Sequence, residues 1–269
     1  MGRYDGRMFT VNSSPYAVEV SHRLGSEDTD SRRSADGMIF TPMKFEKSER
    51  SEIRDGREGR NMNRYEIVDE RNWERAIHCA VFRDCVEPAF CVTFEADITD
   101  FRKAVKEQSL SFTMAMVYAV SKCANEIEAF RYRFLDGNVV LFDRIDTAFT
   151  YMAPGDRLFK VVNVPFTDDM AEYCRTALEA AQVQKEYFAG PLGNDVFQCS
   201  PMPWVTYTHI SHTNSGKRDN ATPLFDWGKY HEKDGRTVMP VSVQAHHSFV
   251  DGIHIGEFVE KLQQFFDNF

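Results

Sequence analysis

Residues 239–252 carry the sequence MPVSVQAHHSFVDG, which predicts a strand followed by a turn that leads into a helix. Alternate side chains of a strand share a face. One face of this strand is apolar and ends in a histidine: it consists of Val241, Val243, Ala245 and His247. The other face is polar and consists of Ser242, Gln244 and His246.

His247 is the stronger candidate for a general base. Its position at the end of an apolar row predicts partial burial, which disfavours the imidazolium form and keeps the ring neutral near pH 7. His246 faces the polar side and is the weaker candidate. Asp251 and Gly252 follow in the turn. There an Asp fixes a loop by accepting hydrogen bonds, and a Gly permits a positive φ or a close approach of backbones.

The remainder of the chain from residue 62 alternates strand-like and helix-like segments. Strands are expected near 90–97, 148–152, 158–164 and 204–208, and a hairpin over 131–142 turns at Asp136-Gly137-Asn138. Helices are expected over 100–108 with Thr99 as the N-cap, from Ser111 onward, over 168–188 and after Gly252. The pattern predicts an α+β fold in which helices cover a mixed sheet.

The composition limits the classes of partner. A formal net charge of -9 over 269 residues argues against nucleic acid, because phosphate binding needs clustered Lys and Arg. The sequence contains no run of eighteen apolar residues, and its first residues lack the apolar stretch of a signal peptide. We therefore expect a cytoplasmic protein without a membrane partner. The six cysteines form no CxxC pair and are expected to be reduced thiols.

Residues 1–61 differ from the rest of the chain. They contain eleven basic and eleven acidic residues and show no lasting period of 2 or 3.6. Such a segment buries too little apolar surface to offset its ordering entropy. We expect a disordered N-terminal extension over 1–61 and a folded domain over 62–269.

Residues 246–256, with the sequence HHSFVDGIHIG, resemble the active-site segment of the chloramphenicol O-acetyltransferase family. The HHxxxDG motif alone is shared with dihydrolipoamide acyltransferases and peptide-synthetase condensation domains. Further matches keep the family's order and spacing from about residue 65 to 269, and they are Trp73-Glu74-Arg75, Asp97-Ile98-Thr99-Asp100-Phe101, Phe130-Arg131, Ser200, Pro203-Trp204-Val205, Gly228-Lys229-Tyr230 and Met239-Pro240. The whole series is much more specific than the motif.

The resemblance implies a chloramphenicol acetyltransferase-like two-layer fold in a homotrimer with active sites between subunits. It also implies direct transfer of an acetyl group from acetyl-CoA to a hydroxyl of chloramphenicol, without a metal. His247 would remove the hydroxyl proton, and Ser200 would donate a hydrogen bond to the oxyanion. General-base assistance is typically worth ~10²–10⁴-fold in rate.

The resemblance assigns supporting roles to seven further residues. Asp251 is implied to pair with Arg75, and this pair fixes the turn that carries His247 without relaying protons. Coenzyme A would lie against Trp204, Lys229 and Tyr230. The acceptor pocket would contain Phe82 and Phe90.

Two departures from the family pattern affect the acceptor and the oxyanion. Asp226 stands where the family has a threonine that helps to hold a water, and a carboxylate there is repulsive unless it is protonated or turned away. Pro88 and Ala89 replace the usual cysteine-containing pair of the acceptor stretch. Transfer to a different small hydroxylated acceptor therefore stays open as an alternative.

Other functions carry weaker signals. His209 and His212 are three residues apart, which in a strand puts them on opposite faces, and no third ligand is evident, so we expect no metal site. A catalytic core that acts on carrier-bound acyl groups is disfavoured, because the sequence contains no lipoyl domain or phosphopantetheine-carrier segment. A non-catalytic homologue that keeps the fold is disfavoured because both His247 and Ser200 are retained.

Overall fold

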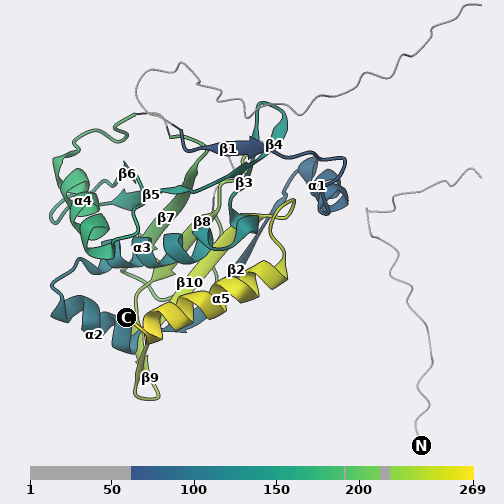
Figure 1. Ribbon diagram of the computed structural model, residues 1–269. Helices are drawn as coiled ribbons and strands as arrows, with labels where there is room; N and C mark the ends of the chain where they lie inside the picture. The colour runs from purple at the N-terminus through teal and green to yellow at the C-terminus, as the bar shows by residue number, and fades with distance from the viewer. Residues whose placement is uncertain (1–61, 191, 213–218) are drawn as a thin grey trace, which may run out of the picture. The chain divides into compact units, whose positions relative to one another are not determined.

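The computed structural model describes residues 62–190, 192–212 and 219–269 (Figure 1). The expected disordered extension over 1–61 lies outside the described residues. The helices are α1 (Ala76–Arg83), α2 (Thr99–Glu107), α3 (Phe112–Asn125), α4 (Met170–Val183) and α5 (Gly252–Asp267), with a 3-10 turn η1 (Glu128–Phe130). The strands are β1 (Tyr65–Ile67), β2 (Ala89–Asp97), β3 (Tyr132–Leu135), β4 (Asn138–Phe142), β5 (Asp146–Tyr151), β6 (Lys160–Val164), β7 (Val196–Met202), β8 (Leu224–Gly228), β9 (His231–Lys233) and β10 (Arg236–His246).

The strands form two sheets. The larger is seven-stranded in the order β2-β10-β8-β7-β5-β6, with β9 paired to β10, and the smaller is β1-β4-β3. Within the larger sheet β7 pairs in parallel with β5 and β8, and the other pairs are antiparallel. The expected α+β class with a mixed sheet is therefore confirmed.

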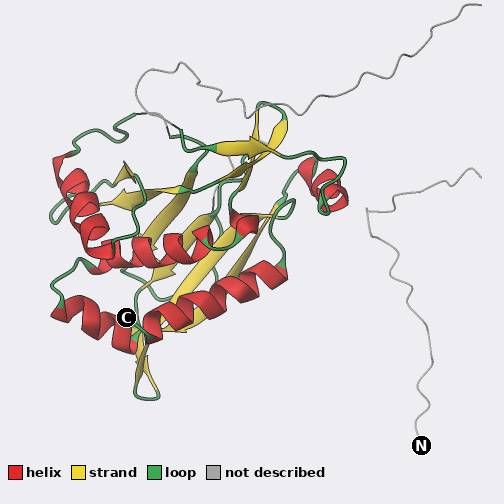
Figure 2. Ribbon diagram, viewed as in Figure 1, coloured by secondary structure: helices red, strands yellow, loops and turns green. Residues whose placement is uncertain are grey.

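Helices α2, α3, α4 and α5 cover one face of the larger sheet (Figure 2). The core lies between these layers and is rich in aromatic rings. Phe225 of β8 is fully buried against Phe130, Phe197 and Phe258, with ring centroids 5.2–5.9 Å apart. Burying a side chain of this kind contributes roughly 1.5–3 kcal/mol, so this layer fixes the spacing between β8 and α5.

Several sequence-based expectations are confirmed. Strand β2 and helix α3 begin within one residue of their predicted starts. The β3–β4 hairpin turns at Asp136 and Gly137, whose φ angles of 49° and 83° are the left-handed pair that a two-residue hairpin requires.

Other expectations are wrong at the level of single elements. The segment 204–208 is a loop, because β7 already ends at Met202 and the chain then turns back across the sheet. The helix expected to reach residue 188 ends at Val183, where the Gln184 side chain donates hydrogen bonds to Val161 O and Glu186 O. Thr99 does not cap α2; its hydroxyl donates to Asp97 and accepts from the Thr237 N–H.

Among the residues that the structure describes, no helix has both the length and the apolar content needed to cross a lipid bilayer.

Candidate active site

The candidate base lies where β10 gives way to the turn before α5. The backbone N–H of His247 donates to Pro88 O at 2.9 Å, which extends the β2–β10 ladder by one residue. The imidazole stacks on Phe82 of α1, with centroids 4.1 Å apart and planes within 6°. Phe90 of β2 contacts it from a second direction at 4.7 Å. Two aromatic rings thus pack against the imidazole, and the His247 side chain is 36% exposed.

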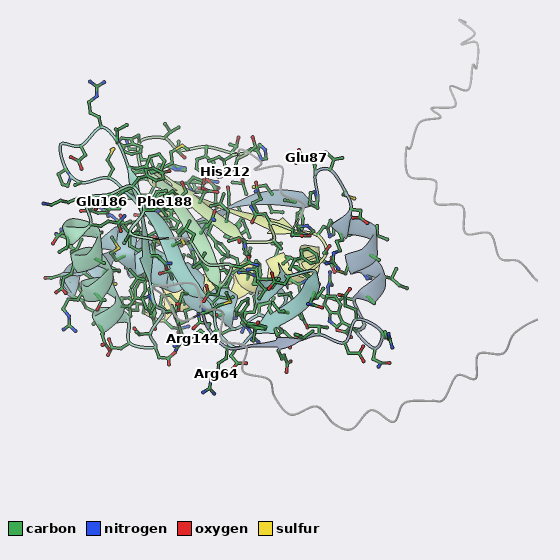
Figure 3. The ribbon with its side chains drawn as sticks, turned by 90° about the horizontal axis from the view of Figure 1, so that it is seen from above. Arg64, Glu87, Arg144, Glu186, Phe188 and His212 are labelled. Carbon is green, nitrogen blue, oxygen red and sulfur yellow. The ribbon has the colours of Figure 1, made fainter. Side chains whose placement is uncertain are left out.

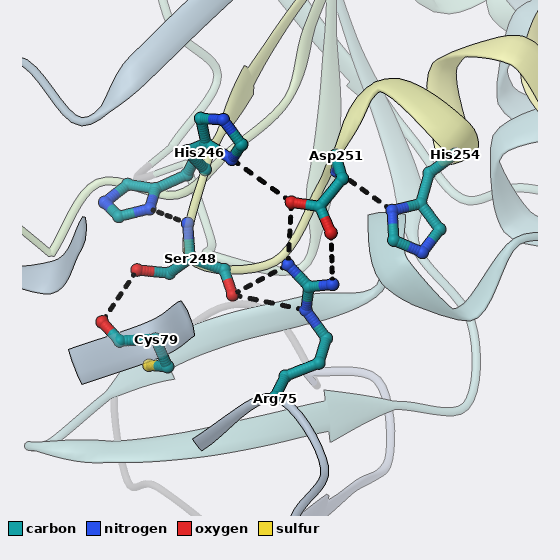
Figure 4. Close-up of polar contacts among 7 residues, drawn as sticks. Arg75, Cys79, His246, Ser248, Asp251 and His254 are labelled. Atoms are coloured by element: carbon teal, nitrogen blue, oxygen red, sulfur yellow. Dashed lines mark hydrogen bonds and ion pairs between the residues drawn. The ribbon is translucent and has the colours of Figure 1, made fainter. Parts of the chain in front are cut away.

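A bidentate ion pair fixes the turn that carries this histidine. The guanidinium of Arg75 donates to Asp251 at 2.6 and 3.1 Å and reaches Ser248 O at 3.4 Å (Figure 4). The hydrogen bonds from Arg75 hold the pKa of the Asp251 carboxyl below its ordinary value. The structure therefore contains the Arg75–Asp251 pair that the resemblance implies.

Asp251 also lies beside the candidate base. Its Oδ1 is 3.2 Å from Nδ1 of His247, but the buried Nδ1 makes no hydrogen bond to any described residue. An aligned proton relay needs a directed hydrogen bond. The geometry therefore agrees with a loop-fixing role for Asp251.

The neighbouring polar groups of the turn are engaged in its own structure. His246 is buried, and its Nδ1 accepts from the Ser248 N–H at 3.2 Å. The Ser248 hydroxyl donates to Cys79 O in α1. His254 accepts the Asp251 N–H at 2.9 Å, and burial lowers the pKa of its ring (Figure 4). The sequence reasoning missed His254, although its position three residues after Asp251 is the spacing of a capping box.

Ser200 lies in a different part of the sheet. It is the register partner of Asp226 in β8, which is in turn the partner of Ser242 in β10. Ser242 pairs with Thr93 of β2, and their hydroxyls lie 2.7 Å apart. Register partners point to the same face, so these four side chains form one polar row across the sheet.

His247 and Ser200 are not brought together within one chain. Ser200 and Ser242 lie two strands apart in register, and His247 follows Ser242 by five residues. Two strand spacings of about 4.8 Å and five rises of about 3.3 Å separate the two Cα atoms by roughly 19 Å. Five residues of alternation also direct the two side chains to opposite faces of the sheet.

Asp226 is neither turned away nor isolated. Its carboxylate is fully buried, and Oδ2 lies 2.8 Å from Nε2 of His212. Burial raises the pKa of Asp226, and the hydrogen bond to Asp226 raises the pKa of His212 above its ordinary value. His212 thus has a carboxylate partner from a distant strand, and no group of three potential metal ligands occurs in the described part of the chain.

The residues assigned to coenzyme A gather at the end of β8. The Lys229 N–H donates to Val205 O at 2.8 Å, which holds the loop with Trp204 against this strand end. Gly228 permits the approach, because a Cβ there would lie 2.8 Å from Val205 O. Trp204 is 64% exposed and Lys229 is exposed beside it. An exposed aromatic face and an ammonium suit an adenine ring and phosphates, and the assignment of this surface to coenzyme A stays a prediction.

Tyr230 extends the same surface. Its ring packs against Phe112 at 6.1 Å, and the guanidinium of Arg102 lies 4.7 Å above it. Tyr230 is therefore held at the start of α3 with part of its ring exposed.

Comparisons with known proteins agree with this architecture. The family model for chloramphenicol acetyltransferase matches residues 62–263. Chloramphenicol acetyltransferase 2 of Haemophilus influenzae is 29% identical over 205 residues, which cover 75% of this chain and 96% of that protein. Chloramphenicol acetyltransferase 3 of Escherichia coli is 24% identical over 204 residues, with coverage of 74% and 96%. A solved chloramphenicol acetyltransferase structure matches with a TM-score of 0.70 at 29% identity, and covers 76% of this chain and 100% of its own.

These matches define the class as an acyltransferase that depends on acetyl-CoA. Since the family model spans most of the described domain, the chain belongs to the chloramphenicol acetyltransferase family.

Proposed function

We propose that this protein transfers the acetyl group of acetyl-CoA directly to a hydroxyl of chloramphenicol, with His247 as the general base. The observation that carries the proposal is the fixed imidazole: aromatic rings hold it on two sides, and the Arg75–Asp251 pair fixes the turn below it. A base held in one orientation loses little entropy when the acceptor binds.

The geometry of the ring assigns the proton transfer to one nitrogen. Nδ1 of His247 is buried toward Asp251, so Nε2 is the nitrogen that accepts the hydroxyl proton. The hydroxyl oxygen adds to the thioester carbonyl carbon of acetyl-CoA and forms a tetrahedral oxyanion, and the C–S bond breaks when this intermediate collapses. His247 then returns the proton to the departing thiolate, which leaves the base unchanged after one turnover. Trp204, Lys229 and Tyr230 would hold the coenzyme.

The oxyanion donor comes from a second subunit in this proposal. Ser200 of the same chain is too distant from His247, at roughly 19 Å between Cα atoms, to share one carbonyl carbon with it. A site between subunits removes this conflict, because His247 of one subunit can face Ser200 of the next. A head-to-tail contact with a rotation of about 120° between subunits closes into a ring of three. We therefore propose the homotrimer that the family resemblance implies.

Acetyl transfer to another small hydroxylated acceptor is the second candidate. The observation that favours it is the position of Pro88, whose carbonyl oxygen accepts the His247 N–H and which directly precedes β2, the strand that contains Phe90. The altered stretch thus lies directly beside the base, where a changed wall alters the acceptor pocket. A cytoplasmic location remains a prediction.

Release of coenzyme A tests the activity. The protein is incubated with acetyl-CoA, with and without chloramphenicol, and the free thiol is measured. We expect turnover only with the drug, and a loss of ~10²–10⁴-fold in kcat for His247→Ala. The exposed His209 provides a matched control, since His209→Ala should retain full activity.

The outcomes separate the candidates. No turnover at millimolar drug refutes chloramphenicol as acceptor, and a panel of alcohols then tests the second candidate. An unchanged rate in His247→Ala contradicts the general-base assignment. Absence of turnover with every acceptor favours a non-catalytic homologue.

Subunit mixing tests the shared site. His247→Ala and Ser200→Ala chains are each nearly inactive, but a mixed trimer regains every site that pairs an intact His247 with an intact Ser200. Random association of equal amounts restores about one quarter of the sites. A mixture with no more activity than its two components contradicts a site built from two subunits.

A further inference from the structure

A buried acid–base pair lies on the sheet face that carries Ser200. Asp226 is fully buried in β8, and its Oδ2 accepts the ring N–H of His212 at 2.8 Å. Its Oδ1 is buried as well and accepts no hydrogen bond from a described residue. His212 comes from the loop after β7 and lies on the opposite side of the domain from Arg64 and Arg144 (Figure 3). A buried carboxylate is costly without a compensating charge.

The pair is adjacent to the proposed oxyanion donor. Asp226 and Ser200 are register partners in neighbouring parallel strands, and their side chains share a face. Three other titratable groups lie close enough for the charge of Asp226 to raise their pKa values, and they are Cys91 of β2, Cys199 of β7 and Tyr207 of the loop. All three are acids with pKa values raised by burial, so among the described residues His212 is the base that balances this carboxylate.

We propose that Asp226 and His212 are a positioning pair that holds one shared proton beside Ser200 and keeps this end of the transfer site electrically neutral. This inference rests on the proposed function, because it concerns the environment of the oxyanion. With one proton the pair consists of an imidazolium and a carboxylate with no net charge. Without that proton a bare buried carboxylate faces the developing oxyanion and opposes it.

The direction of the pH dependence follows from the shared proton. The hydrogen bond to Asp226 raises the pKa of His212 above its ordinary value, so the neutral pair persists to higher pH than an unpaired imidazolium would and is lost as the pH rises through the raised pKa. Two unit charges about 6 Å apart at an effective dielectric constant of about 20 interact strongly enough to change a rate roughly 100-fold. We therefore expect kcat to fall about 10- to 100-fold as His212 deprotonates.

Asp226→Asn and His212→Gln test the pair by opposite changes of charge. Asp226→Asn keeps the size of the side chain and removes the charge, so the alkaline decline in kcat should disappear. His212→Gln leaves the carboxylate without its base, so kcat at neutral pH should fall about 10- to 100-fold. The double variant has no charge to balance and should recover most of that loss. His209→Gln, at an exposed histidine of the same loop, is the control.

An NMR titration of the His212 ring makes the test independent of the acceptor. In the wild-type protein His212 should titrate above 6.5, and in Asp226→Asn its pKa should fall. Equal His212 pKa values in the two proteins, or an alkaline decline in kcat that persists in Asp226→Asn, would overturn the proposal. A wild-type protein that shows the expected NMR titration but acetylates no acceptor refutes the proposed function and leaves the proton pair established.

Discussion

The Arg75–Asp251 pair offers a direct test of how the turn holds His247. Asp251→Asn keeps the shape of the side chain but removes the charge that accepts two guanidinium hydrogen bonds at 2.6 and 3.1 Å. The side chain of Arg75 is 12% exposed and that of Asp251 is 26% exposed, so solvent replaces the lost interaction only in part. The substitution leaves a largely buried guanidinium without its carboxylate.

The expected effect is moderate in stability and larger in rate. Hydrogen bonds to charged, partly buried groups contribute about 1.5–3 kcal/mol in total here, which corresponds to a fall in Tm of roughly 3–12 °C. A displacement of the base by about 1 Å can cost ~10²-fold. We therefore expect kcat to fall about 10- to 100-fold in Asp251→Asn while the KM for acetyl-CoA stays nearly constant.

The acid dependence of stability gives a second measurement of the same pair. Arg75 holds the pKa of Asp251 below its ordinary value, so the stabilisation is complete above the unfolded-state value near 3.8. It is lost as the pH falls through the lowered folded-state pKa. The difference in unfolding free energy between wild type and Asp251→Asn should therefore be constant at neutral pH and shrink in strong acid.

The assay combines thermal unfolding with steady-state kinetics. Glu126→Gln is the control, because it breaks surface pairs with Lys122 and Lys261 that are together worth at most about 1 kcal/mol. Arg75→Lys keeps the positive charge without the two-pronged geometry and should lie between wild type and Asp251→Asn. An Asp251→Asn protein with the wild-type Tm and kcat refutes the reasoning. A lower Tm with an unchanged kcat shows that the pair stabilises the fold without positioning the base.

Further predictions concern the oxyanion donor and the coenzyme surface. Ser200→Ala should lower kcat ~10²–10³-fold with an unchanged Tm, and an effect below tenfold contradicts an oxyanion role. Trp204→Ala should raise the KM for acetyl-CoA about 5- to 30-fold at constant kcat, and a change in acceptor KM alone would contradict the assignment. Gly228→Ala places a Cβ against Val205 O and should destabilise the protein by about 1–3 kcal/mol. Gly256→Ala, in open space on α5, should instead be neutral or stabilising by about 0.5–1 kcal/mol.

Local sequence patterns predicted the elements whose structure depends on residues that are close together in the sequence. The Asp136-Gly137 turn needs two positive φ angles, and few residue pairs other than this one supply them at low cost. Alternation along β10 similarly predicted that His247 and His246 face opposite ways, but the face predicted to be polar is buried at His246, whose ring accepts a hydrogen bond from its own turn. In both cases the deciding interactions lie within a few residues of each other in sequence.

The predictions that were wrong concern segments whose structure depends on contacts with residues distant in the sequence. The segment 204–208 alternates like a strand. However, the Lys229 N–H donates to Val205 O, and the backbone of Gly228 lies close to Val205, and these contacts hold the segment as a loop. The His212–Asp226 pair joins residues 14 apart through the return of this loop over the sheet. No local period marks such a contact, so nothing in the sequence pattern connects His212 with Asp226.

The alternation that identifies His247 also explains why one chain is insufficient for the proposed reaction. The apolar face of β10 ends at His247, and the opposite face contains Ser242. Ser242 is the register partner of Asp226 in β8, which is the register partner of Ser200 in β7. Side chains on the two faces of one sheet cannot reach the same carbonyl group, because the backbone of the sheet lies between them. The separation of base and oxyanion donor therefore follows from strand geometry and does not depend on any particular loop. In the proposed trimer, substitutions that weaken the contact between subunits should for this reason lower kcat even where they touch no substrate, and dilution of the protein should reproduce that loss.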